Sequence, residues 1–117
     1  MITASLNPHL SFNGTCEAAF NFYKSVFGGE FSAFYRYENA PFLGTPDSEK
    51  EKVMHVELRI TEHVRLMGGD MSEPSTPPVQ FGNNVSLVIS LASDEETHRV
   101  YDALSAGGTI HKPLPSL

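Results

Sequence analysis

Residues 13–30, NGTCEAAFNFYKSVFGGE, decide the fold because they mark a helix with a defined start and a defined end. Thr15 can cap the helix N-terminus, and Gly28-Gly29 can end it. Apolar residues recur between them at steps of three and four, which places them on one stripe: Ala19, Phe20, Tyr23, Val26 and Phe27. A helix with such a stripe must bury it, so the flanking segments are expected to supply a sheet.

Alternating apolar and polar residues predict strands on both sides of this helix. Residues 5–12 alternate before it, and residues 31–37 form an aromatic strand after it. Residues 53–60 alternate most clearly, and residues 63–67 follow so closely that the two segments are expected to form a hairpin.

A shorter second half repeats this order after a segment rich in glycine and proline. It contains a strand-like alternation at 84–91, a helix that runs from the capping residue Ser93 to about Ala106, and the start of a strand at 109–114. The repeat is weak, with three pairs that each lie 79 residues apart: Phe12 and Leu91, Glu17 and Glu96, and Gly28 and Gly107. We therefore predict one domain over 1–117, with a first module at 1–69, a linker at 70–83 and a partial second module at 84–117.

Composition limits the classes of partner. The chain has 117 residues, 40% of them hydrophobic, and a net charge of −6, which disfavours nucleic acid and anionic lipid as partners. The sequence contains no apolar run of bilayer length and no signal-peptide pattern, so we expect a cytoplasmic protein. The one cysteine, Cys16, excludes an internal disulfide and has no histidine near it in sequence, so we interpret it as a buried packing residue.

The polar face of the predicted sheet has two interpretations. With the helices on the aliphatic side, the other side carries Asn7, His9, Ser11, His55, Glu57, Arg59, Ser86 and Ser90. Such a face is an ordinary solvated surface in many antiparallel sheets, or a site if the sheet curls into a cleft. His55 and Glu57 project the same way, which suits metal ligands or an acid–base pair, although Glu57 could simply pair with Arg59.

Several segments resemble the PhnB-like branch of the vicinal oxygen chelate superfamily, which includes glyoxalase I, bleomycin-resistance proteins and extradiol dioxygenases. The resemblance rests on residues 13–30, on VMHVEL at 53–58 and on GNN at 82–84, and it spans nearly the whole chain. It implies an α+β fold of tandem βαβββ modules, with a curled mixed sheet, helices on its outer face, and a homodimer. Relatives continue with a further strand after the position of Leu117, so either a tail follows this residue or the second module is truncated. A truncated module would leave an open sheet edge, which a partner chain is expected to cover.

The resemblance also implies a site. Glu57 matches the carboxylate-ligand position of metal-dependent relatives, His9 lies near the first-strand position, and Ser86 falls where a ligand would be expected but is a poor one. We therefore expect Glu57 and His55 as catalytic residues and one divalent metal (Zn, Ni, Mn or Fe) on Glu57 and His9. The expected ligand pocket contains Ser11, Tyr35, Arg59 and Ser86.

Three functions stay open at this point. The protein could be a metal-assisted lyase, isomerase or dioxygenase-type enzyme, with Glu57 as ligand or base. It could instead be a metal-free binder of the bleomycin-resistance kind, for which the acidic balance suits a cationic ligand, or a structural module without a ligand. Some relatives carry the label 3-demethylubiquinone methyltransferase. This sequence has no glycine-rich loop between a strand and a helix to hold a nucleoside cofactor, so its residues do not support that activity.

Overall fold

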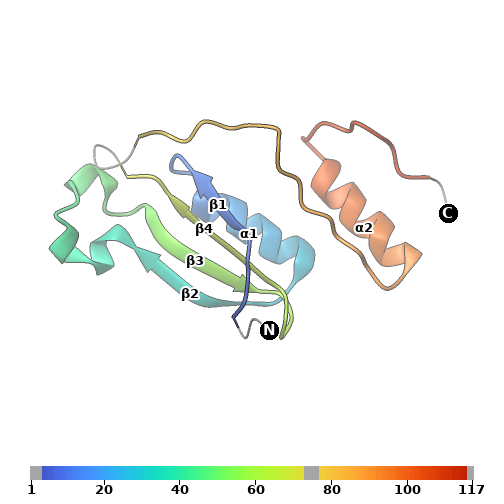
Figure 1. Ribbon diagram of the computed structural model, residues 1–117, viewed down its shortest axis with the longest axis horizontal. Helices are drawn as coiled ribbons and strands as arrows, with labels where there is room; N and C mark the ends of the chain where they lie inside the picture. Colours follow the sequence, from blue (N-terminus) through green and yellow to red (C-terminus); the bar gives the residue numbers. More distant parts are fainter. Residues whose placement is uncertain (1–3, 73–76, 116–117) are drawn as a thin grey trace. The chain divides into compact units, whose positions relative to one another are not determined.

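The computed structural model describes residues 4–72 and 77–115, so part of the predicted linker at 70–83 lies outside the described residues. The chain divides into two compact units, Met1–Gln80 and Phe81–Leu117, and each is described by itself. The first unit contains the strands and one helix: β1 (His9–Phe12), α1 (Cys16–Phe27), β2 (Glu30–Arg36), β3 (Val53–Arg59) and β4 (Arg65–Asp70) (Figure 1). Between β2 and β3 the chain makes short 3₁₀ turns at Tyr37–Asn39, Pro41–Leu43 and Asp47–Glu49.

The four strands form one open mixed sheet in the order β1-β4-β3-β2. β1 runs parallel to β4, whereas β4 with β3 and β3 with β2 are antiparallel pairs. The predicted hairpin is therefore confirmed, although its second strand is β4 at Arg65–Asp70 rather than residues 63–67. The first strand is also shorter than predicted, because pairing with β4 begins at His9 rather than at residue 5.

Helix α1 covers one face of this sheet and builds the core, as its apolar stripe predicts (Figure 1). Phe20 from α1 is fully buried against the inward side chains Val56 and Leu58 of β3. The ring of Phe20 lies so close to β4 that a Cβ on Gly68 would stand 2.5 Å from it. Glycine at position 68 therefore allows the helix to approach the sheet.

A β-bulge in β2 changes which residues of that strand face the core. Phe31 pairs with Leu58 and Ala33 pairs with Glu57, so Ser32 is the additional residue. The bulge allows Phe31 and Phe34, three positions apart, both to pack against the core. Ser32 then lies beside β3, where its hydroxyl donates to the main-chain oxygen of Glu57 at 3.5 Å.

The second unit contains the helix α2 (Asp94–Ser105), which begins as predicted: the Ser93 hydroxyl accepts a hydrogen bond from the main-chain nitrogen of Glu96 at 3.1 Å. The two strands predicted in this half are wrong, since residues 84–91 and 109–114 have no strand assignment in the structure. The apolar residues of 84–91 are exposed, with Val85 at 82% and Leu87 at 53%. Alternation indicates a strand only where a neighbouring strand pairs with its main chain, and within the described residues of this unit none does.

Among the helices that the structure describes, none has the length and apolar character needed to cross a membrane.

Candidate functional site

The face of the sheet opposite α1 carries most of the residues that the sequence singled out. Because side chains alternate along a strand, Val56, Leu58 and Leu66 point to the core and their neighbours point the other way. The strand register then aligns His9, Met67, Glu57 and Ala33 in one row that crosses all four strands. We call this exposed side the polar sheet face.

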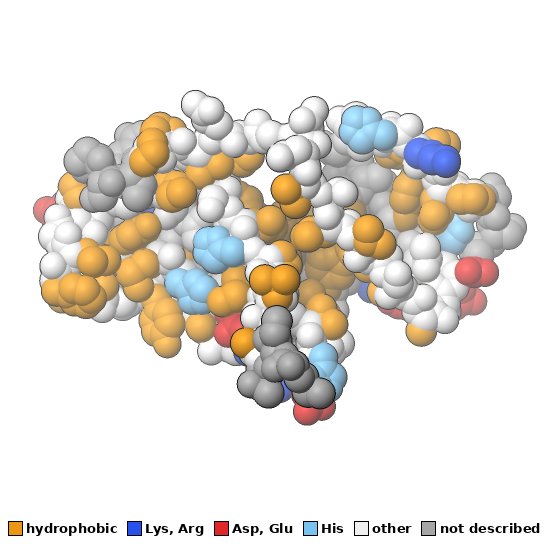
Figure 2. Space-filling view, in the orientation of Figure 1, with side chains coloured by type: hydrophobic (Ala, Val, Ile, Leu, Met, Phe, Trp, Pro, Cys, Tyr) orange, Lys and Arg blue, Asp and Glu red, His pale blue; other side chains and the backbone are white. Residues whose placement is uncertain are grey.

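Two histidines stack on the polar sheet face. The rings of His9 on β1 and His55 on β3 have centroids 6.0 Å apart and planes inclined by 16°. These strands are not neighbours, since β4 runs between them, and the β4 residue opposite Ser11 is Gly69. Position 69 has no room for a side chain, because a Cβ there would lie 2.6 Å from the Met54 carbonyl oxygen. Figure 2 shows two histidine side chains next to each other on the surface in this orientation.

Glu57 lies next to this stack as an ionised carboxylate. Its side chain is only 15% exposed, and the Arg65 guanidinium on β4 donates to its Oε1 at 3.1 Å. The Ser32 hydroxyl and the Arg65 guanidinium hold the pKa of the Glu57 carboxyl below its usual range, and nearby His55 acts in the same direction. Glu57 is therefore available at neutral pH as a hydrogen-bond acceptor and not as a proton donor.

The structure brings together most of the predicted site residues, all within the first unit. His9, His55, Glu57 and Arg59 lie on the polar sheet face, and the register places Tyr35 opposite His55. Ser86 belongs to the second unit, in the irregular segment 84–91. Arg65 was missed by the sequence reasoning, and the partner expected for Glu57 was Arg59. The signal that could have identified Arg65 is its position in the hairpin, diagonal to Glu57.

The predicted metal site lacks a complete set of protein ligands among the described residues. Within residues 4–72 and 77–115, no three His, Cys, Asp or Glu side chains are grouped so that they could hold one metal ion. One side of the Glu57 carboxylate is already occupied by Arg65. His9, His55 and Glu57 therefore do not form a closed metal site by themselves.

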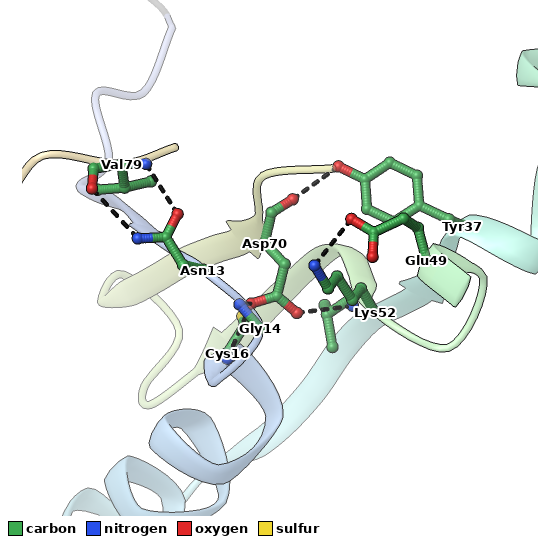
Figure 3. Close-up of polar contacts among 9 residues, drawn as sticks. Asn13, Gly14, Cys16, Tyr37, Glu49, Lys52, Asp70 and Val79 are labelled. Carbon is green, nitrogen blue, oxygen red and sulfur yellow. Dashed lines mark hydrogen bonds and ion pairs between the residues drawn. The ribbon is translucent and has the colours of Figure 1, made fainter. Parts of the chain in front are cut away.

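A second polar cluster surrounds Asp70 at the end of β4 (Figure 3). Asp70 is 4% exposed, and its Oδ1 accepts hydrogen bonds from the main-chain nitrogens of Gly14 at 2.9 Å and Cys16 at 3.0 Å. Its Oδ2 accepts from the Val53 nitrogen at 2.9 Å, and its main-chain oxygen accepts from the Tyr37 hydroxyl at 2.6 Å. Asp70 thus joins β4 to the start of α1 and to β3.

This arrangement corrects the expected cap of α1. Thr15 occupies the capping position but makes no side-chain cap hydrogen bond, and the carboxylate of Asp70 instead accepts from the first amide of the helix, that of Cys16. Close by, the Asn13 side chain donates to the main-chain oxygen of Val79 at 3.1 Å and accepts from its nitrogen at 2.7 Å (Figure 3). Sequence reasoning missed Asp70 because it assigned residues 70–83 to a linker.

An open pocket of about 580 Å³ adjoins this cluster. It is lined mainly by charged residues: Gly14, Glu17, Arg36, Glu38, Ser48, Glu51, Lys52, Val53 and Asp70. Its two basic groups are already engaged, since Arg36 binds Glu17 through two nitrogens at 3.0 and 2.8 Å and Lys52 binds Glu49 at 2.8 Å. These pairs tie β2 to α1 and close the loop before β3, which is a structural role.

Cys16, the first residue of α1, is confirmed as a buried packing residue of the core. Its side chain is fully buried, and burial, together with the nearby Asp70 carboxylate, raises the pKa of its thiol to about 12. The thiol is therefore protonated at neutral pH and is not an activated nucleophile.

Comparison with known proteins identifies relatives over nearly the whole chain. A family model described as 3-demethylubiquinone-9 3-methyltransferase matches residues 4–115. The crystal structure of protein PA1353 from Pseudomonas aeruginosa is similar, with a TM-score of 0.83 and 30% identity over 98% of this chain and 82% of that one. A putative 3-demethylubiquinone-9 3-methyltransferase, the PhnB protein from Bacillus cereus, has a TM-score of 0.74 and 28% identity over 97% of this chain and 83% of that one. No curated protein matches the chain.

Proposed function

The chain belongs to the PhnB-like family described as 3-demethylubiquinone-9 3-methyltransferase, with neighbours of the vicinal oxygen chelate fold, and on this basis we propose that it binds a small molecule on the polar sheet face. The observation that carries the proposal is the stack of His9 and His55 beside the ionised Glu57. Two imidazoles offer flat surfaces and nitrogens, and Glu57 offers an acceptor of lowered pKa. A few polar groups on a rigid sheet are typical of a site that orients a ligand.

The methyl transfer named in the family description would need a binding site for a nucleoside methyl donor. The junction between β1 and α1, where such a site would be expected, does not fit one. A strand-to-helix junction binds phosphate or nucleotide groups through free main-chain amides at the helix start. Here the amides of Gly14 and Cys16 are already bonded to Asp70. The family description therefore supports kinship and fold, and these residues do not support methyl transfer.

A divalent metal on His9 and Glu57 is the second candidate, because an imidazole and a carboxylate on one face are suitable ligands for zinc, nickel, manganese or iron. In that case Glu57 would exchange Arg65 for the metal, and further ligands would be needed. Elemental mass spectrometry of protein purified without chelator tests this candidate. About one metal per chain, lost in Glu57→Gln, would support it, and a metal-free protein that also refuses added metal would exclude it.

We also propose that the protein forms a homodimer. The exposed apolar residues Val85, Leu87 and Ile89 support this, because burying such a row against a second copy removes them from water. Light scattering after size-exclusion chromatography tests it, and a monomeric mass at micromolar concentration would contradict the proposal.

The experiment for the main proposal is a thermal-shift screen with a fragment library. The wild type is compared with His55→Ala and with His63→Ala, a matched control because the His63 side chain is 88% exposed in the turn between β3 and β4. Fragments that bind the proposed site should stabilise the wild type and His63→Ala but not His55→Ala. Fragments that stabilise all three proteins equally would place the site elsewhere and contradict the proposal.

A further inference from the structure

Two arginines lie directly opposite each other at one end of the polar sheet face. Arg59 on β3 pairs in register with Arg65 on β4, one row beyond Glu57 and Met67. Side chains that face each other across a sheet have Cβ atoms roughly 5 Å apart, and like charges in this position destabilise the pair. Such an unfavourable pair on an exposed face suggests that a negatively charged group of a ligand offsets the repulsion between the two arginines when the ligand is bound.

The carboxylates nearby neutralise only one of the two arginines. Glu57 accepts from Arg65 at 3.1 Å. The guanidinium of Arg59 makes no hydrogen bond or ion pair with any residue that the structure describes. Glu30 stands opposite Arg59 in the register, but its carboxylate lies 3.6 Å from the ammonium of Lys24.

The polar sheet face thus has a charge opposite in sign to that of the chain. With neutral histidines, Glu57 balances Arg65 and Glu30 balances Lys24, which leaves the positive charge of Arg59 unbalanced here, whereas the whole chain has a net charge of −6. The net charge of the whole sequence suggested a cationic ligand. That net charge sums over all charged residues, whereas the fold gathers particular ones on this face. The local charge favours an anionic ligand.

The spacing of the rows suggests how such a ligand could extend. The row that contains His9 and Glu57 is two residues away from the row of Arg59 and Arg65, or about 7 Å along the strands. The side chains of arginine reach over much of this distance, and guanidinium groups bind the oxygens of carboxylates and phosphates in pairs. A ligand with the dimensions of one aromatic ring and one acidic group would extend from the arginine row to the row of His9 and Glu57. His55 lies one row further along β3, and its ring is stacked on that of His9.

We infer that the ligand of the polar sheet face carries an oxyanion that binds at Arg59 and Arg65, with its planar part toward His9 and His55. This inference rests on the proposed function and adds the chemical class of the ligand. Arg59 is the free partner of the oxyanion, and Arg65 is shared between the oxyanion and Glu57.

The test is an NMR titration at fixed ionic strength and neutral pH with benzoate and phenyl phosphate, and with the neutral benzamide as the matched probe. The signals observed are the arginine Nε–H groups and the main-chain amides of β3 and β4. Both anions should shift the signals of Arg59 and Arg65, and Arg59→Gln should weaken their binding about 10-fold, whereas Arg99→Gln, a surface arginine of α2, should not. Because the Arg59 guanidinium makes no hydrogen bond or ion pair within the described residues and its strand pairing is made by the main chain, replacement by glutamine is not expected to disturb folding.

The outcomes separate this inference from the proposed function. If benzamide binds as well as benzoate, or if Arg59→Gln binds the anions as the wild type does, the inference is wrong while the site remains. If neither anion reaches the face but fragments of another class do, the inference is also wrong. If no small molecule perturbs the face at all, the proposed function itself fails.

Discussion

The hydrogen bonds of Asp70 give the sharpest prediction for stability. Its carboxylate accepts from three main-chain nitrogens at 2.9, 3.0 and 2.9 Å, and the residue is 4% exposed. A hydrogen bond to a charged group contributes about 1.5–3 kcal/mol, and a buried donor left without a partner costs a similar amount. Because the three bonds share one carboxylate and the backbone can relax, we expect Asp70→Ala to lower the free energy of unfolding by roughly 3–5 kcal/mol.

Asp70→Asn replaces one carboxylate oxygen by an NH₂ group at nearly constant volume, so it tests the hydrogen bonds of the two oxygens separately. Its amide oxygen can still accept from Gly14 and Cys16, but its NH₂ group would face the N–H of Val53. We expect a smaller loss, roughly 1–3 kcal/mol, because one buried donor is left without a partner. The matched control is Asp47→Asn: the Asp47 side chain is 94% exposed and pairs with Lys50 on the surface, so its replacement should leave stability unchanged.

Urea unfolding followed by tyrosine fluorescence measures these differences. The chain has four tyrosines and no tryptophan. Three of the tyrosines lie in the first unit, and the Tyr37 hydroxyl is bonded to the main-chain oxygen of Asp70; Tyr101→Phe removes the signal of the second unit. The expected order of stability is wild type and Asp47→Asn, then Asp70→Asn, then Asp70→Ala. If Asp70→Asn unfolds at the same urea concentration as the control, the carboxylate does not hold the start of α1 to β3 and β4, and the reasoning is refuted.

Three further predictions concern single side chains. Native Cys16 should react with a thiol reagent far more slowly than the urea-unfolded chain, because burial raises its pKa to about 12, and equal rates would contradict its burial. Gly68→Ala should lower the free energy of unfolding by roughly 1–3 kcal/mol in urea, because the added methyl would stand 2.5 Å from the ring of Phe20. Gly82→Ala, which meets no atom closer than 3.6 Å, should change little, and equal effects would contradict the tight packing. In a carbon-detected NMR titration, the pKa of Glu57 should lie below the ordinary value of a glutamate and should rise in Ser32→Ala. The stability from its ionised form is then present at pH above the pKa of the unfolded state and is lost as pH falls through the lower folded-state pKa. A pKa that is unchanged in Ser32→Ala would contradict the role of Ser32.

The first unit could be predicted because each of its sequence patterns indicates an element that the neighbouring elements can pair with or cover. The apolar stripe of α1, the alternation of 53–60 and the short hairpin are local signals, and the structure contains all three. The 84–91 segment alternates just as clearly but forms no strand in the structure. A strand depends on a neighbour for its main-chain hydrogen bonds, and a single sequence does not reveal whether that neighbour is present.

The candidate site could be predicted in part for a related reason. His9, His55, Glu57 and Arg59 were identified because side-chain alternation fixes which face they share. Arg65 and Asp70 were missed for different reasons. Arg65 reaches Glu57 diagonally within the β3–β4 hairpin, and alternation alone does not give the register of that pairing. Asp70 bonds to residues more than 50 positions earlier in the chain. Register and bulges, which also bring Ser32 to Glu57, are tertiary properties.

The most direct test of the central proposal is to observe the imidazole nitrogens of all five histidines by NMR while fragment hits are added. The proposal predicts that bound fragments shift the ring signals of His9 and His55 together, because their rings are stacked, and leave His63, His98 and His111 in place. Hits that leave both His9 and His55 unchanged would show that the polar sheet face is an ordinary solvated surface and would contradict the account.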